Sequence, residues 1–262
     1  MNNYSTYLQR MTDSCNISSK HLILDFVSGN KVLDVGCGSG VLLEQLKNFN
    51  AEGIDLNPKS VSFCTNKGLT AHHCALHDVR GKFDTIIFSS VLHEFSSYDK
   101  TAPYTQWPIE DALHDAYNHL NVGGKIIIRD GIKAQRYDTV KLHARKKQVI
   151  DAFRKYLDDA PMFYDRTFKV NQYVITADAE VLKEFLFTYT WGTESYEREV
   201  NEQYGILTEP QWLDIVSRAG FAVEFNQTYE EEYVKYLSKH FYPTRSLKKL
   251  LSNSTMLIVG KK

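Results

Sequence analysis

The chain has 262 residues and a net charge of −1; 43% of its residues are hydrophobic and 24% are charged. This composition is that of an ordinary globular protein and excludes intrinsic disorder, collagen and a fibrous coiled coil. The longest apolar runs, such as 126–128 and 256–259, are far shorter than the roughly 20 residues needed to cross a bilayer. We therefore expect no membrane span, and because 1–20 shows no leader pattern, we expect a cytoplasmic protein.

Four cysteines are too few for a disulfide framework in a chain of this length. None of them shows the Cys-x-x-Cys spacing of a zinc ribbon. We expect reduced, structural thiols at Cys15, Cys37, Cys64 and Cys74.

Strands and helices alternate from residue 31 to residue 130. Buried apolar runs predict the strands, and periodic segments with start and stop signals predict the helices. Such alternation produces parallel strands with helical crossovers, so the predicted fold class is α/β, a doubly wound, mostly parallel sheet with helices on both faces. The predicted elements are strands over 31–35, 51–55, 68–74, 83–88 and 125–130 and helices over 18–29, 41–49, 57–66 and 107–120.

This alternation breaks over 131–208, where a basic helix (139–157), an aromatic-rich stretch (163–174) and another helix (178–187) are predicted. A helix and two strands then complete the sheet. We therefore expect three parts in the chain. They are a core with an N-terminal helical segment over 1–130, an inserted, mainly helical cap over 131–208, and the completion of the core over 209–262, with its helix at 209–219 and strands at 221–226 and 255–259.

A glycine turn follows the first strand. Gly36, Gly38 and Gly40 allow backbone N–H groups to approach a ligand beside a helix N-terminus. Asp55 ends the second strand 19 positions after Gly36, close to the ~20-residue spacing at which a carboxylate accepts hydrogen bonds from ribose hydroxyls. Val41 stands where pyrophosphate-binding dehydrogenases have their last glycine, which disfavours NAD. The pattern predicts a nucleotide-type pocket.

Four segments of the chain, each made of a predicted strand and an adjoining turn, form a recognisable set. They are Val32-Leu-Asp-Val-Gly-Cys-Gly-Ser-Gly40, Gly53-Ile-Asp55, Phe83-Asp-Thr-Ile-Ile-Phe-Ser-Ser-Val-Leu-His93 and Leu120-Asn-Val-Gly-Gly-Lys-Ile-Ile-Ile128. Together they resemble the class I S-adenosylmethionine-dependent methyltransferases, over roughly residues 31–130 and the final strand. The resemblance implies a seven-stranded sheet with an antiparallel last strand, S-adenosylmethionine (SAM) as cofactor at the carboxyl edge of the first strands, and S-adenosylhomocysteine as product.

The resemblance also implies the residues that bind SAM. Asp34 and the glycine turn would border its amino-acid portion, and Asp55, followed by Leu56, would hold the ribose. Cys74 stands where the family often has an acidic residue at the adenine. The remaining predicted cofactor-binding residues are Ala75 and Leu76, beside the adenine, and Ser90, after the fourth strand.

Methyl transfer is an in-line displacement, so the protein mainly aligns the acceptor and removes its proton. His93 follows the fourth strand and Asp130 ends the fifth, at the edge where doubly wound sheets bind ligands, and we predict both as catalytic residues. In the structural alternatives, His93 only lines the pocket, and Asp130 pairs with Arg129 or caps a turn. None of the histidine clusters forms a helical i, i+4 pair or has a companion cysteine set, so we expect no metal.

Charge is distributed unevenly along the chain. Residues 133–176 carry 10 basic and 5 acidic side chains and 233–262 carry 7 basic and none acidic, whereas 177–232 carries 3 basic and 13 acidic. Basic side chains beside aromatic ones suit phosphates and stacked bases, but these cations could equally form solvated faces or pair with the acidic segment. The first basic block is Lys141, Arg145, Lys146, Lys147, Arg154 and Lys155, and the second is Lys235, Lys239, Arg245, Lys248 and Lys249.

The sequence therefore predicts a SAM-dependent methyltransferase whose cap closes over the cofactor and selects the acceptor. The methyl group would go to an O or N atom of a small-molecule or nucleotide acceptor. Because the basic blocks could bind negative charge, this acceptor could be anionic. One alternative is an RNA methyltransferase that uses the basic blocks. The other is a SAM-binding protein without catalysis.

Overall fold

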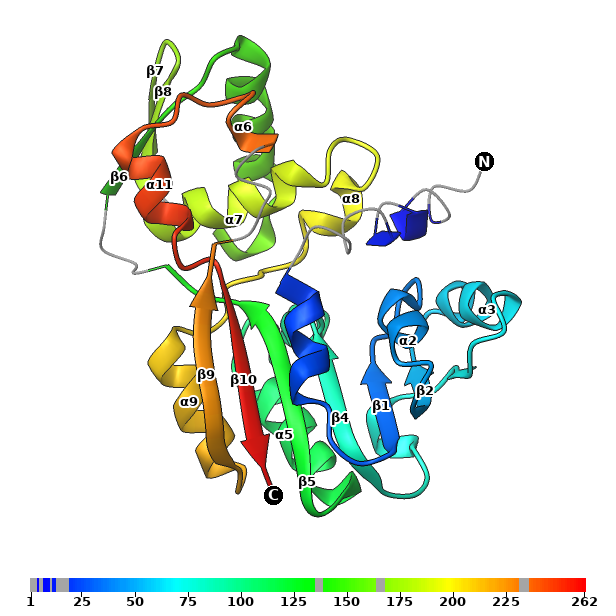
Figure 1. Cartoon of the computed structure of the whole chain (residues 1–262). Helices are drawn as coiled ribbons and strands as arrows, with labels where there is room; N and C mark the ends of the chain where they lie inside the picture. The colour runs from blue at the N-terminus through cyan, green and yellow to red at the C-terminus, as the bar shows by residue number, and fades with distance from the viewer. Residues whose placement is uncertain are drawn as a thin grey trace.

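The computed structural model describes residues 4, 7–9, 11–12, 19–134, 139–163, 168–230 and 236–262. Cys15 and Lys235, and the parts of the predicted cap at 135–138 and 164–167, lie outside these ranges. The described residues form a seven-stranded sheet and a three-stranded sheet. Figure 1 shows the smaller sheet and its helices above one end of the larger sheet.

The large sheet has the strand order β3-β2-β1-β4-β5-β10-β9. Its strands pair in parallel, except that β10 is antiparallel to both of its neighbours. The predicted doubly wound fold with an antiparallel last strand is therefore confirmed. The strands are β1 (Lys31–Val35), β2 (Asn50–Ile54), β3 (Ala71–His72), β4 (Phe83–Ser89), β5 (Leu120–Gly131), β9 (Ala222–Tyr229) and β10 (Thr255–Lys261).

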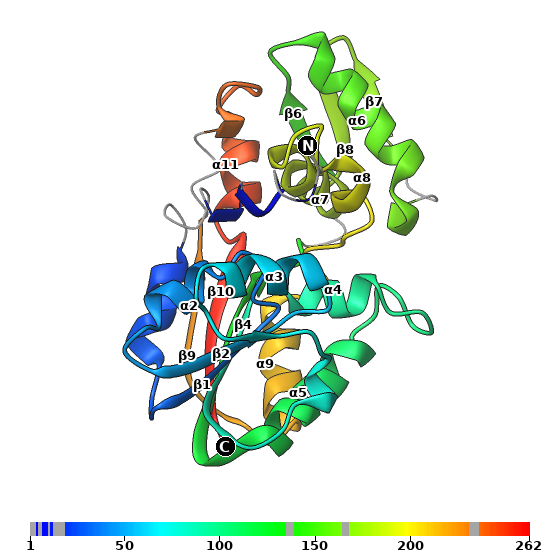
Figure 2. The same ribbon diagram turned by 90° about the vertical axis from the view of Figure 1, so that its right-hand side faces the viewer.

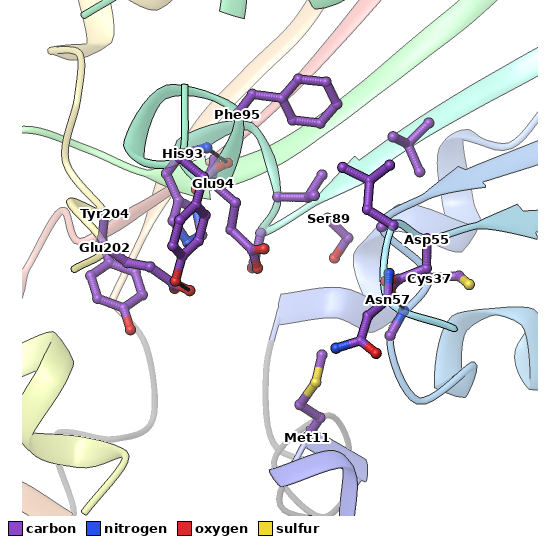
Figure 3. Close-up of a pocket in the computed structure, with 18 of the residues that line it drawn as sticks. Met11, Cys37, Asp55, Asn57, Ser89, His93, Glu94, Phe95, Glu202 and Tyr204 are labelled. Carbon is purple, nitrogen blue, oxygen red and sulfur yellow. Dashed lines mark hydrogen bonds and ion pairs between the residues drawn. The ribbon is translucent and has the colours of Figure 1, made fainter. Parts of the chain in front are cut away.

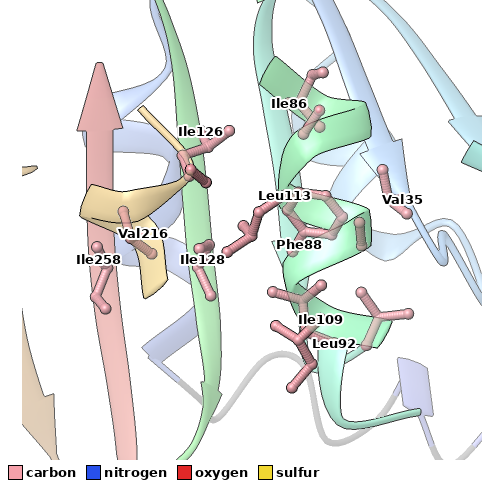
Figure 4. Packing of buried hydrophobic residues seen from close by; sticks show 14 of the residues in the cluster. Val35, Ile86, Phe88, Leu92, Ile109, Leu113, Ile126, Ile128, Val216 and Ile258 are labelled. Atoms are coloured by element: carbon pink, nitrogen blue, oxygen red, sulfur yellow. The ribbon is translucent and has the colours of Figure 1, made fainter. Parts of the chain in front are cut away.

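Helices cover both faces of this sheet because successive strand residues point to opposite sides. Ile86 and Phe88 pack with α5 and α9 on one face, as the cluster in Figure 4 shows, whereas Ile87 packs with η1 and α2 on the other. The predicted helix over 18–29 is present as the 3-10 helix η1. The elements are η1 (Ser19–Phe26), α2 (Val41–Gln45), α3 (Pro58–Asn66), η2 (Leu76–Asp78), α4 (Leu92–Ser97), α5 (Trp107–His119) and α9 (Glu209–Arg218).

The cap lies over the carboxyl ends of the parallel strands (Figures 1 and 2). The predicted basic helix over 139–157 is wrong in its first part, because 139–143 forms a strand in which Leu142 is buried between the exposed Lys141 and His143. From residue 168 onward, the aromatic-rich stretch forms a hairpin. The cap elements are β6 (Thr139–His143), α6 (Lys147–Asp159), η3 (Pro161–Phe163), β7 (Phe168–Asn171), β8 (Val174–Asp178), α7 (Ala179–Thr190) and α8 (Tyr196–Glu199).

A second segment of the chain also packs into the cap. Leu237, Phe241 and Leu247 belong to the same buried cluster as Leu142 and Phe153 of the first segment. Leu247 lies on α11 (Arg245–Leu251), which follows β9 and precedes β10 in the sequence. We therefore assign 236–251 to the cap, although the sequence placed this stretch with the core. None of the described helices is long and apolar enough to cross a membrane.

Candidate active site

A cavity of about 1660 Å³ is lined by residues of both the core and the cap. Its core side is formed by the turns that follow β1, β2 and β4, so it lies where β1 pairs with β2 on one side and β4 on the other. This is the point where doubly wound sheets bind ligands. Its cap side is formed by residues of α7 and α8, and Tyr4, Tyr7 and Met11 of the N-terminal segment also line it.

The glycine turn is held by Asp55. Gly38 N donates to Asp55 Oδ2 at 2.9 Å, and Asn57 N donates to Asp55 Oδ1 at 2.7 Å. Gly36 and Gly38 have φ of 68° and 51°, values that favour glycine. A Cβ on Gly38 would also lie 2.6 Å from Met11 Cε. The carboxylate therefore ties the turn after β1 to the turn after β2.

Most of the predicted cofactor-binding residues line this one cavity. Gly40 does not, since it precedes α2 as its N-cap, and a Cβ there would meet Leu69 and Cys64. The assignment of contacts to SAM stays a prediction for all of them. The residues that line the cavity are Asp34, Gly36, Gly38, Asp55, Leu56, Ala75, Leu76 and Ser90.

The core side of the cavity fits the chemistry of SAM. Asp34 and Asp55 are the carboxylates predicted to border its amino-acid portion and to hold its ribose, and Leu56, 71% exposed, adds an apolar side chain to the lining. Ser89 Oγ is buried at the same edge without a hydrogen-bond partner in the described part of the chain, as a group awaiting a ligand would be (Figure 3). The residues present therefore fit this cofactor.

The backbone is strained at the end of β4. Ser90 has φ of 57°, a conformation that is uncommon for residues other than glycine. Ser90 N donates to Arg129 O at 2.7 Å, and the Arg129 guanidinium donates to Ser90 Oγ. These two hydrogen bonds hold the turn that leads into His93.

His93 and Asp130, the two predicted catalytic residues, are brought together. His93 Nδ1 lies 2.7 Å from Asp130 Oδ1, and Nε2 lies 3.6 Å from Glu202 Oε2. Burial alone would lower the pKa of His93, but the charges of Asp130 and Glu202 outweigh it and raise that pKa well above its usual range. The imidazolium that results has no lone pair with which to accept a proton. This geometry favours the alternative in which His93 lines the pocket without acting as the base.

Glu94, next in the chain, pairs with Arg198 of the cap. Arg198 donates from its guanidinium to Glu94 Oε2 at 2.9 Å and to Glu202 Oε1 at 3.0 Å. Burial and then the charge of Glu202 raise the pKa of Glu94 to about 7. For Glu202, burial is outweighed by the hydrogen bond with His93 and the charge of Arg198, so the pKa of Glu202 is lowered. One partly buried network thus links the residues that follow β4 to α8.

The acidic segment 177–232 supplies these cap residues, and several of its carboxyl groups are buried within the cap. Glu184 accepts from Tyr204 N and Gly205 N, both at 2.7 Å, and Glu199 accepts from the Tyr204 hydroxyl. The only sequence signal for them was the acidic excess of this segment. These carboxyl groups are buried beside the cavity or behind it: Glu180, Glu184, Glu199 and Glu202.

One group in the described part of the chain has the donor set of a metal site. One ligand atom each of His93, Glu94 and Glu202 lies within 4.8 Å of the others. Arg198 already donates to both carboxylates and supplies the balancing positive charge. The expectation that no metal is bound stays a prediction.

Comparisons with known proteins agree with this architecture. The profile of the MetW family, described as methionine biosynthesis protein MetW, matches residues 18–102. Ribosomal RNA small subunit methyltransferase C of Serratia proteamaculans is 30% identical over 129 residues, which are 44% of this chain and 35% of that protein. The chain thus spans about a third of the length of the curated relatives it matches.

Solved structures match over nearly the whole chain. A SAM-dependent methyltransferase of Thermotoga maritima, described as a possible histamine N-methyltransferase, matches 99% of this chain and 96% of its own, with 13% identity and a TM-score of 0.56. The 1,6-didemethyltoxoflavin-N1-methyltransferase of Burkholderia thailandensis, with its acceptor and S-adenosylhomocysteine bound, matches 99% and 83%, with 12% identity and a TM-score of 0.53. The chain therefore has the fold of the SAM-dependent methyltransferases, as its motifs predicted.

Proposed function

We propose that this protein is a SAM-dependent methyltransferase that methylates an N or O atom of a small molecule. The observation that carries the proposal is one cavity with two different sides. The turn that contains Gly36 and Gly38, together with Asp55, forms the side that suits SAM, and the cap contributes the opposite side. A methyl donor and an acceptor can therefore meet inside one site.

The positions of the basic blocks support a small acceptor over RNA. Lys141, Lys147 and Arg154 are exposed on β6 and α6 and do not line the cavity. Among the described cations of both blocks, Lys239 alone lines it. An RNA bound along the outer face of the cap would have to pass a base beneath the cap to reach the cofactor.

The acceptors named for the two solved structures also support a small acceptor. The Burkholderia enzyme holds a small heteroaromatic acceptor, and the Thermotoga protein is described with a small amine acceptor. Both match nearly the whole chain, including the cap. The curated relatives named for ribosomal RNA and ribosomal protein L11 match less than half of it.

Transfer of a radiolabelled methyl group tests the proposal. SAM carrying labelled methyl is incubated with the protein and a cell extract, which is then separated by size, with and without ribonuclease. We expect label in the small-molecule fraction, unchanged by ribonuclease, and no label with the Gly38→Val variant. Ribonuclease-sensitive label in macromolecules would favour the RNA alternative. SAM binding with no labelled product would favour the non-catalytic alternative.

A further inference from the structure

Carboxyl groups gather in the half of the cavity that the cap covers. Figure 3 shows Glu94 between Ser89 and Asp55 on one side and Glu202 and Tyr204 on the other. Its side chain is 29% exposed, and it lies at the point where the cofactor side meets the cap side. The region in which a methyl group would be transferred is therefore bordered by a carboxylate.

A second carboxyl group in this half has an unused acceptor. Glu199 lines the cavity and is only 1% exposed, and its Oε1 has no hydrogen-bond partner among the described residues. Its other oxygen accepts from the Tyr204 hydroxyl. A buried acceptor of this kind costs stability unless a ligand donates to it.

Aromatic rings complete the cap side. Tyr7 lies 5.4 Å from Trp191, and Tyr204 lies 5.1 Å from Phe187, measured between ring centroids. All four side chains line the cavity. Aromatic faces beside carboxyl groups attract cations and repel anions. Arg198 lies over the Tyr7 ring, 4.6 Å from its centroid, and Arg129 and Lys239 also line the cavity. Acidic side chains outnumber these cations in the lining, so an anionic acceptor, which the sequence allowed, is disfavoured.

We propose that the acceptor is a protonated amine and that Glu94 binds its ammonium group and takes its proton. This inference rests on the proposed function. A proton passes from the acceptor nitrogen to a carboxylate oxygen of Glu94, and the freed lone pair forms the bond to the methyl carbon. The carbon–sulfur bond breaks, with its electron pair remaining on sulfur. The products are a methylated ammonium and a neutral thioether, and Glu94 then releases its proton to water.

Glu94 suits this role better than its neighbours. Its pKa of about 7 allows it to accept a proton near neutral pH and release it again. Both ring nitrogens of His93 already face carboxylates. Glu202 accepts from Tyr98 and Arg198 at Oε1 and faces His93 at Oε2, whereas Glu94 pairs with Arg198 at Oε2. The charged groups that set the ionisation of Glu94 are Glu202, Arg198, His93 and Asp55.

The charge of the acceptor can be tested without knowing its identity. A small-molecule extract is passed at pH 7 over a cation exchanger and, in parallel, an anion exchanger, and each fraction is incubated with the protein and labelled SAM. The proposal expects the acceptor activity in the fraction retained by the cation exchanger. Acceptor activity in its flow-through, or retained by the anion exchanger, overturns the amine assignment while leaving the proposed function in place. No labelled product in any fraction overturns both.

The role of Glu94 is tested with Glu94→Gln, which keeps the size of the side chain. We expect methyl transfer from the active fraction to fall about 100-fold or more, while the affinity for SAM, measured by calorimetry, changes less than about twofold. The rate of the unaltered protein should rise with pH to a plateau with a midpoint near 7, and the variant should lose that rise. Glu197→Gln is the matched control, an exposed glutamate of α8 that does not line the cavity. Activity within twofold of the control, with the same pH profile, would exclude Glu94 as the base.

Discussion

The two halves of the cavity are built in different ways. The cofactor half consists of turns that follow neighbouring strands, and its main contact, Gly38 to Asp55, joins residues 17 positions apart. The cap half depends on side chains from distant segments, and Glu94 and Arg198 lie 104 positions apart. The first half uses backbone groups and glycine conformation, whereas the second uses buried charges.

This difference explains what each half can contribute. A backbone turn binds a constant ligand in a constant geometry, and it tolerates little change in sequence. A network of side chains on an inserted cap can be changed without disturbing the sheet, so it is the natural place for acceptor choice. Variants that affect one half and spare the other are therefore the sharpest tests of the division.

The largest expected effect follows from Gly38→Val. Valine at a φ of 51° is strained, and its Cβ would displace Met11, so we expect SAM affinity to fall by about 100-fold or more. Isothermal calorimetry measures the affinity, and circular dichroism checks the fold. Gly68→Val is the matched control, because Gly68 also has a positive φ but faces open space. Equal loss of affinity in both variants would show that strain alone, and not the cavity, is responsible.

A large effect on the cap half is expected from Glu202→Gln. The change removes a buried negative charge that lies against His93 and Arg198, and we expect it to lower the free energy of unfolding by about 2–4 kcal/mol. The affinity of the folded protein for SAM should change little. Urea unfolding and calorimetry measure the two quantities. If SAM affinity fell as steeply as stability, the two halves would not be separate.

A smaller effect concerns the cap side and is seen in the pH dependence of the free energy of unfolding. Burial raises the pKa of Glu184 to about 7, from about 4.3 in an unfolded chain. Its contribution to stability is complete below about pH 4.3 and is lost as the pH rises through about 7, because the unfolded state then releases the proton more readily. Glu184→Gln should flatten the fall in unfolding free energy between pH 5 and 7 in urea titrations. An unchanged slope would contradict the assignment.

His93 contributes to pH dependence in a different range. Its pKa is raised well above the usual value near 6.5, so its contribution is complete below about pH 6.5 and is lost only as the pH rises through the raised pKa. The slopes due to Glu184 and His93 therefore have the same sign but occur at different pH. A titration that continues into alkaline solution separates them.

The sequence predicted the sheet and the cofactor half because their signals are local. Alternation of strands and helices, the glycine turn and the position of Asp55 are all visible within about 30 residues. The cap half was missed because Glu202 comes close to His93 only when the cap is folded over the end of β4. The helix predicted over 139–157 failed for a related reason, since 139–143 takes up strand geometry by pairing with β8.

The smallest expected effect concerns the basic blocks. Lys147 and Arg154 are exposed on α6, away from the cavity lining, so Lys147→Gln with Arg154→Gln should change the free energy of unfolding by no more than about 0.5 kcal/mol. Methyl transfer to a small acceptor should stay within twofold, because neither side chain reaches the acceptor. Radiolabel assays at low and high salt measure this. Two results together would contradict this: a marked fall in activity in the variant, and a similar fall in the unaltered protein at high salt. They would mean that the outer face of the cap takes part in acceptor binding, as a polyanion would require.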